Sequence, residues 1–142
     1  MDQFIEIKKG LKEEHININP LFEKIYTPPG YGEDMISRLY NDGSLYYLIK
    51  DSNPSENEKH DSSWGYISYI EEEGMDMILI LIERCCEINF REKMQGNLPG
   101  LIRWKLLCNN RIKQVDVRGI PSGDEKLLAE IDDIVSTRIA KI

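Results

Sequence analysis

The chain has 142 residues, of which 41% are hydrophobic, so it is long and apolar enough to fold as one domain without a metal ion or disulfide bonds. Its formal net charge is −7, and phosphate contacts need clustered Lys and Arg, so direct binding to nucleic acid is not expected. The longest apolar run, Met77 to Ile82, is far shorter than the ~18 residues of a membrane span, so no membrane association is expected either.

The negative charge is concentrated in the first half of the chain. Residues 1–76 carry 16 acidic and 7 basic side chains, a net charge of −9, whereas residues 77–142 carry 9 acidic and 11 basic side chains, a net charge of +2. All seven tyrosines lie in the acidic half. An acidic field of this kind attracts a basic protein partner.

The cysteine pattern predicts free, mostly buried thiols. Cys85, Cys86 and Cys108 are an odd number of cysteines with an adjacent pair, which makes a poor disulfide framework. No Cys-x-x-Cys motif occurs and the two histidines, His15 and His60, lie far apart in the sequence, so neither a metal site nor a cofactor is predicted. The first residues are acidic and lack the apolar stretch of a secretory signal, which makes the cytoplasm the expected compartment.

Helical material is expected before the first strand. Phe4, Ile7 and Leu11 follow helical spacing and favour a helix over residues 3–13, although Phe-Ile-Glu-Ile-Lys also fits a short strand. Asn19-Pro20 is typical of a helix start and predicts a short helix with Leu21, Phe22 and Ile25 facing inward.

A β-hairpin is expected next, over residues 35–40 and 44–50. The connecting Asn-Asp-Gly ends in Gly43, which can take the positive φ of a bulged hairpin turn. In the strand over residues 44–50, successive side chains point to opposite faces of the sheet, which gives two sets. The first set is Leu45, Tyr47 and Ile49, and the second is Tyr46 and Leu48.

An exposed polar connection and a further strand follow the hairpin. Residues 51–63 contain no apolar side chain and one proline, which is typical of a long surface loop. Residues 64–72 resemble a strand, and Glu73-Gly74 a turn. The residues expected on one face of this strand are Trp64, Tyr66, Ser68 and Ile70.

Residues 77–90 allow two interpretations. The run Met-Ile-Leu-Ile-Leu-Ile favours a strand buried on both faces, with a bulge near residues 83–85. A helix capped by Asp76 is the alternative.

A second hairpin is expected over residues 101–108 and 111–119, with Asn109-Asn110 as its two-residue turn. Counting back from this turn predicts three cross-strand pairs, and the last of them joins opposite charges. These pairs are Trp104 with Val115, Ile102 with Val117, and Arg103 with Asp116.

The chain ends in a predicted amphipathic helix that begins with a capping box of Ser122 and Glu125. Its apolar stripe consists of Leu127, Leu128, Ile131, Ile134, Val135, Ile139 and Ile142. The sequence therefore predicts a single α+β domain over residues 1–142. About six strands form an antiparallel meander, with helical segments before it and the C-terminal helix packed on the sheet.

No catalytic arrangement is recognisable, so an enzyme is not expected. The acidic cluster Glu71-Glu72-Glu73 is read as strand and turn, where neighbouring side chains point to opposite faces and cannot pair easily. His60-Asp61 lacks an accompanying nucleophile elbow. Gly30-Tyr31-Gly32 lacks the spacing and the lysine of a phosphate-binding loop.

The candidate site is therefore a protein-binding surface that combines carboxylates with aromatic side chains. Tyr and Trp are enriched at interfaces, although those of the first strands equally suit a core. The residues predicted to contact a basic partner are Tyr31, Glu33, Asp34, Tyr46, Trp64, Tyr66, Glu71, Glu72, Glu73 and Asp76.

In its size, its acidic first half and its lack of catalytic residues, the chain resembles the small immunity proteins that neutralise bacterial toxins. That resemblance implies a cytoplasmic inhibitor that occludes a basic partner such as a nuclease toxin, and it carries over no site residue. Residues 35–142, with strands followed by a long amphipathic helix, are also similar to helix-grip domains. The alternative that this implies is a binder of a small molecule or lipid, with a cavity between the sheet and the C-terminal helix.

Overall fold

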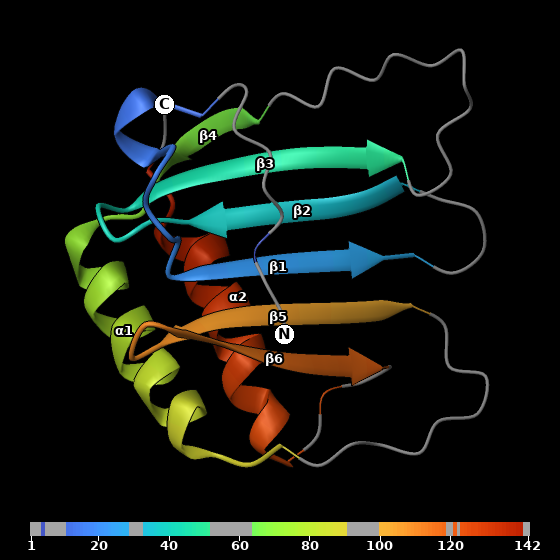
Figure 1. Ribbon diagram of the computed structural model, residues 1–142. Coiled ribbons are helices and arrows are strands. Elements are labelled where there is room, and N and C mark those ends of the chain that lie inside the picture. The colour runs from blue at the N-terminus through green and yellow to red at the C-terminus, as the bar shows by residue number, and fades with distance from the viewer. Residues whose placement is uncertain are drawn as a thin grey trace.

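The computed structural model describes residues 4, 11–28, 33–51, 64–90, 100–118, 121 and 123–140. In these parts of the chain, six antiparallel strands form one sheet in the order β4-β3-β2-β1-β5-β6, and two helices cover one of its faces (Figure 1). The strands are β1 (Phe22–Thr27), β2 (Glu33–Leu39), β3 (Ser44–Asp51), β4 (Gly65–Tyr69), β5 (Leu101–Cys108) and β6 (Arg111–Arg118). The helices are α1 (Glu72–Glu87) and α2 (Lys126–Arg138), with one-turn 3₁₀ helices η1 (Glu13–His15) and η2 (Gly123–Glu125). The predicted α+β class is confirmed.

Strand β1 lies in the middle of the sheet, where the Asn-Pro signal predicted a short helix, so that prediction was wrong. β1 pairs with β2 on one side and β5 on the other, which places Glu23 opposite both Arg38 and Lys105. Phe22 and Ile25 are buried on opposite faces of the strand. Two-sided pairing and two-sided burial outweighed the local capping signal.

Of the helix predicted for residues 3–13, the structure describes residues 4 and 11–13. Phe4 and Leu11 are buried, and residue 13 begins the single turn η1. The remainder of that prediction lies outside the described residues.

Residues 72–87 form helix α1, so the preferred interpretation of this segment as a strand with a bulge was wrong. The buried residues Met75, Ile78, Ile82 and Cys85 recur at helical spacing and face the sheet. The helix begins at Glu72, which also corrects the predicted turn at Glu73-Gly74 and the expected cap at Asp76.

The register of β4 contains an irregularity that the alternation rule did not foresee. Ser68 pairs with Leu45, but Tyr66 pairs with Tyr46, so Ile67 is an extra residue. The bulge puts Ser68 on the helix-covered face and Tyr66 on the opposite face. The prediction that these two side chains share a face was therefore wrong.

Both predicted hairpins are confirmed. Gly43 has a φ of 91° in the β2–β3 turn, and Asn109 and Asn110 have φ values of 50° and 65° in the β5–β6 turn. The register of β5 and β6 contains all three predicted pairs, including Arg103 with Asp116. Residues 52–63, which hold nearly all of the predicted polar loop, lie outside the described residues.

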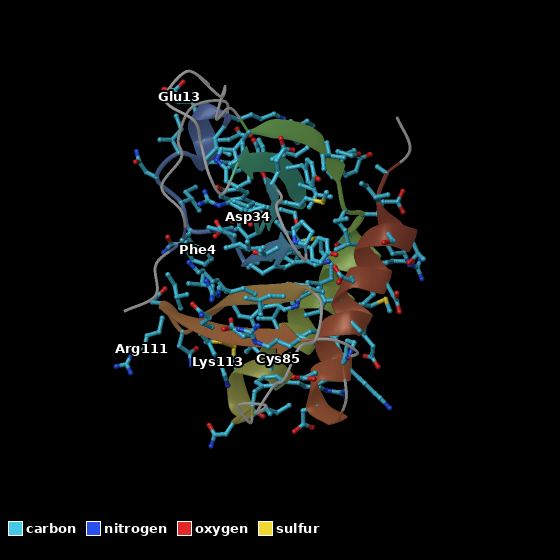
Figure 2. All side chains as sticks on the ribbon, turned by 90° about the vertical axis from the view of Figure 1, so that its right-hand side faces the viewer. Phe4, Glu13, Asp34, Cys85, Arg111 and Lys113 are labelled. Carbon is cyan, nitrogen blue, oxygen red and sulfur yellow. A yellow bond between two sulfur atoms is a disulfide. The ribbon has the colours of Figure 1, made fainter. Side chains whose placement is uncertain are left out.

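The sheet separates two buried clusters. The larger one lies between the sheet and both helices, and includes Trp104, Leu106, Ile78 and Ile131. The smaller one, on the opposite face, includes Tyr46 and Trp64 from the sheet and Leu11 from the N-terminal segment. Figure 2 shows Phe4 and Glu13 on this opposite side, away from the helices. Leu11 and Ile16 therefore pack on the face that the helices leave open.

Helix α2 is confirmed, with a later start than the predicted capping box gave it. It begins at Lys126 after the turn η2, and Ser122 lies outside the described residues. Leu128, Ile131 and Ile134 of the predicted stripe are buried. Neither this helix nor any other helix of the described chain is long and apolar enough to cross a bilayer.

Cys86 and Cys108 form a disulfide bond, so the prediction of three free thiols was wrong. The bond joins the last turn of α1 to the end of β5. The number of cysteines in the sequence does not show that these two elements lie close together. Cys85 remains free and buried, and its burial raises the pKa of the thiol to about 11.

Candidate functional site

The outward face of α1 combines carboxylates with exposed apolar side chains. Between residues 71 and 87 the chain carries six acids and one base, a net charge of −5, and all six acids are exposed. Met77, Leu79 and Ile80 are 43%, 40% and 53% exposed. We call this set the α1 face; its members are Glu71, Glu72, Glu73, Asp76, Met77, Leu79, Ile80, Glu83, Arg84 and Glu87.

Ile80 occupies the middle of the α1 face. On a helix, the neighbours of a side chain lie three and four residues away in both directions. For Ile80 these neighbours are Asp76, Met77, Glu83 and Arg84. The most exposed apolar side chain of the helix is therefore flanked by one apolar group, two carboxylates and one guanidinium.

Helix α2 lies on the same face of the sheet and provides an internal comparison. Its exposed positions include Glu130, Asp133, Ser136 and Thr137, and none of the large exposed hydrophobic side chains of the described chain lies on α2. The exposed apolar groups are therefore a property of α1 and not of both outer helices.

The start of α1 is held against α2. A Cβ atom at Gly74 would come within 2.8 Å of both the Arg138 Cβ and the Ile70 Cγ2, so the helices approach closely here because residue 74 has no side chain. Arg138 also donates to the exposed Glu73 carboxylate across 3.3 Å.

The end of α1 is held against the β5–β6 hairpin. The Lys113 ammonium of β6 donates to the carbonyls of Cys85, at 2.9 Å, and of Ile88. The Cys85 carbonyl also accepts the Ile88 N–H at 3.3 Å, and a cation is favourable at this end of the helix. Together with the Cys86–Cys108 bond, this lysine fixes the last turn. Figure 2 shows Lys113 and Cys85 at this junction.

The predicted partner-binding residues do not form one surface. Glu71, Glu72, Glu73 and Asp76 are exposed at the start of α1. Glu33 and Asp34 begin β2, at the end of the sheet away from the start of α1 (Figure 1). At about 3.3 Å per residue, the strand separates its two ends by roughly 20 Å.

The predicted aromatic residues belong to the face opposite the helices. Tyr46 and Trp64 are 0% and 3% exposed, so these two rings are core side chains. Tyr66 is 40% exposed, and its ring meets that of Tyr46 edge-on at 5.4 Å, with the Lys12 ammonium 3.8 Å from its centre. Tyr31 lies outside the described residues. The acids of α1 adjoin exposed apolar groups of the same helix, and Glu33 lies on the same face of β2 as the exposed Met35.

Sequence reasoning missed Met77, Leu79 and Ile80 as surface residues. Their run with Ile78, Leu81 and Ile82 was read as a strand buried on both sides. The signal that could have found them is the helical spacing of Met75, Ile78, Ile82 and Cys85, which leaves residues 77, 79 and 80 off the buried stripe.

Among the residues that the structure describes, one group of side chains could hold a metal ion. Glu14, His15 and Asp42 each offer a ligand atom, and these atoms lie within 4.8 Å of one another. Glu14 and His15 belong to η1, and Asp42 belongs to the β2–β3 turn. The prediction of no metal site considered only the spacing of cysteines and histidines, so it did not consider this group.

A scan against protein-family models gave no match for this chain, and neither a search of curated proteins nor a search of solved structures found a significant match.

Proposed function

We propose that this protein is a non-catalytic binding protein that docks a basic protein partner on the α1 face. The observation that carries the proposal is the position of Met77 and Ile80, which are exposed beside Asp76 and Glu83 on a helix fixed at both ends. Interfaces combine an apolar centre with a polar rim, and the centre supplies most of the binding energy.

The negative charge of the α1 face indicates that the partner's surface is positively charged. Six carboxylates and one guanidinium over 17 residues attract a basic surface and increase the association rate at low salt. Exposed charges are screened beyond about 10 Å at 0.1 M salt, so association should slow as salt is added.

The rigidity of α1 supports the same role. The close approach of Gly74 to Arg138 and the Lys113 hydrogen bonds hold the helix in place before any partner arrives. A pre-ordered surface loses less conformational entropy on binding than a loose one.

Within this class, the function that we favour is that of an immunity protein or a similar inhibitor. An acidic protein of this kind occludes the site of a basic toxin such as a nuclease, whose own positive charge serves to bind phosphates. In this role the chain itself makes and breaks no bonds.

The cytoplasm is the compartment that we propose for this complex. The Cys86–Cys108 bond provides the test, because disulfides persist in oxidising compartments and are rare in the cytosol. Cells of the source organism are quenched with acid and their thiols are alkylated. Alkylation of all three cysteines agrees with a cytoplasmic location, and an intact bond places the protein elsewhere.

The experiment that tests the binding function compares three tagged proteins in pull-downs from the source cells. The wild type should retain one stoichiometric basic protein. Asp76→Lys/Glu83→Lys should lose it, whereas the matched control Glu130→Lys/Asp133→Lys makes the same change of charge on α2 and should keep it. Retention by all three proteins, or by none, contradicts the proposal.

A second comparison separates charge from apolar contact. With the purified partner, Met77→Ser/Ile80→Ser should mainly speed dissociation, and the double lysine variant should mainly slow association. Surface plasmon resonance at two salt concentrations distinguishes these effects.

The small-molecule alternative requires a cavity between the sheet and α2. Trp104, Leu106, Leu128 and Ile131 occupy this region, and each is at most 2% exposed. No observation on the described residues favours this alternative.

A further inference from the structure

We propose that Glu14, His15 and Asp42 bind a divalent transition-metal ion such as Zn²⁺, at the junction of η1 with the β2–β3 turn. The three ligand atoms lie within 4.8 Å of one another, and His15 Nε2 is 2.8 Å from Asp42 Oδ2. The site is independent of the α1 face and of the function proposed for it.

The His15 ring is held in the orientation that a ligand needs. It is 2% exposed, lies against Tyr40 with ring centres 4.4 Å apart, and has its Nδ1 2.7 Å from the Tyr46 hydroxyl. Metal-ligating histidines almost always have such an outer partner on the second ring nitrogen, because it fixes the tautomer and the ring orientation. Nε2 consequently points toward the exposed Asp42.

The tautomer can change without a change of partners. When Nε2 carries the ring hydrogen, it donates to Asp42, and Nδ1 accepts the hydroxyl hydrogen of Tyr46. When Nε2 binds an ion, Nδ1 carries the hydrogen instead and donates it to the Tyr46 oxygen. A tyrosine hydroxyl can both donate and accept, so it suits either state.

The carboxylates can adjust to an ion. Two ligands about 2.0–2.1 Å from a tetrahedral ion lie roughly 3.3 Å apart, slightly more than the 2.8 Å between His15 and Asp42. The Asp42 side chain is 46% exposed, and its other oxygen, Oδ1, accepts the Ser44 N–H at 2.9 Å. This hydrogen bond anchors Oδ1 and leaves Oδ2 for the ion. Glu14 is exposed and can rotate toward it.

The donor set indicates the class of metal. One imidazole nitrogen and two carboxylates suit zinc and its first-row neighbours, whereas calcium and magnesium prefer oxygen alone. Two carboxylates neutralise a divalent ion, and three protein ligands leave a fourth position for water. A bound ion would join the N-terminal segment to the sheet, over the smaller buried cluster.

The test uses the full chain after treatment with a chelator and dialysis, with the disulfide left oxidised. Zn²⁺ alone is titrated by calorimetry and Co²⁺ alone by visible absorption, and the melting temperature is measured with and without Zn²⁺. The wild type should bind one ion saturably and melt at a higher temperature with it, because the ion binds only the folded state.

Three variants identify the ligands. Glu14→Gln and Asp42→Asn should each weaken the affinity at least about 10-fold, the loss that even outer-shell changes can cause. Both should leave the fold intact, because Glu14 is exposed, and in Asp42→Asn the amide oxygen can keep the Ser44 N–H while the amide NH2 donates to His15 Nε2 once Nδ1 carries the ring hydrogen. Glu13→Gln, an exposed neighbour outside the group, is the matched control and should bind like the wild type. Absence of saturable binding, or equal binding by Glu14→Gln or Asp42→Asn, overturns the proposal.

Discussion

Arg38 Nε donates to Glu23 Oε2 over 2.6 Å, with the two side chains 6% and 0% exposed. The residues face each other across β1 and β2, and the guanidinium lies 4.5 Å from the centre of the Trp64 ring. Charge is thus buried in the middle of the sheet, on the face that the N-terminal segment covers. A buried ion pair of this kind is costly to break from one side, because the remaining charge keeps its desolvation penalty.

The first prediction is a strong energetic coupling between these two residues. Glu23→Leu should lower the free energy of unfolding by about 3–5 kcal/mol, since it leaves the Arg38 guanidinium buried without this carboxylate. The double variant Glu23→Leu/Arg38→Met should lose clearly less than the sum of the two single variants. Urea unfolding of the four proteins gives the coupling energy, and losses that add within about 0.5 kcal/mol would contradict it.

The second prediction concerns the Cys86–Cys108 bond. Removing a bond that closes a loop of 22 residues should cost about 3 kcal/mol, mainly by freeing the unfolded chain. Cys108→Ser and reduction of the wild type should therefore lower the unfolding free energy by similar amounts, and reduction should not affect the variant further.

Thiol titration provides the control for this bond. The denatured, unreduced wild type should contain one reactive thiol, Cys85, and the reduced protein three. In the folded protein Cys85 should react slowly, because burial raises its pKa to about 11 and leaves little thiolate at neutral pH. Three thiols before reduction would show that the bond is absent.

The hairpins could be predicted from sequence because their determinants are local. Asn109-Asn110 tolerates positive φ, and a two-residue turn fixes every pair that follows it, which is why Trp104 was correctly placed opposite Val115. The C-terminal helix is similarly marked by the spacing of its own apolar residues, of which Leu128 and Ile131 are buried.

The remaining elements depend on contacts between distant segments. Strand β1 is a strand because β2 and β5 lie on both sides of Glu23, and no local pattern reports that. The same applies to Cys86, which meets Cys108 only because α1 runs toward the β5–β6 turn. For the candidate site, the predicted contacts Glu71, Glu72, Glu73 and Asp76 are exposed. The predicted contacts Tyr46 and Trp64 are buried, because aromatic residues suit cores and interfaces equally.

The third prediction tests the close approach of α1 and α2. Gly74→Ala would normally stabilise a helix by up to about 1 kcal/mol. Here the new methyl group would lie 2.8 Å from Arg138 Cβ and from Ile70 Cγ2, and relieving this overlap should cost about 1–3 kcal/mol. We expect a net loss of stability by thermal unfolding. A stabilised variant would show that the helices can separate freely at this point.

The fourth prediction is a pH dependence that arises from Asp132 on α2. Burial raises the pKa of this carboxyl above its ordinary value of 3.8, and the hydrogen bond and positive charge of Lys24, whose Nζ lies 2.7 Å away, lower it only in part. The folded protein therefore holds the proton more tightly than the unfolded chain does. The stability that this group contributes is complete below pH 3.8 and is lost as the pH rises through the folded-state pKa.

Two variants should change this pH dependence in opposite directions. Asp132→Asn removes the titration, so the wild type should lose stability relative to this variant as the pH rises through the same window. Lys24→Met removes the group that lowers the pKa, so the loss should extend to higher pH than in the wild type. Urea unfolding at pH values from 3 to 7 measures both differences. The opposite result, in which the wild type gains stability relative to Asp132→Asn as the pH rises, would contradict the prediction. It would mean that the Lys24 ammonium, and not burial, determines the direction of the pKa shift of Asp132.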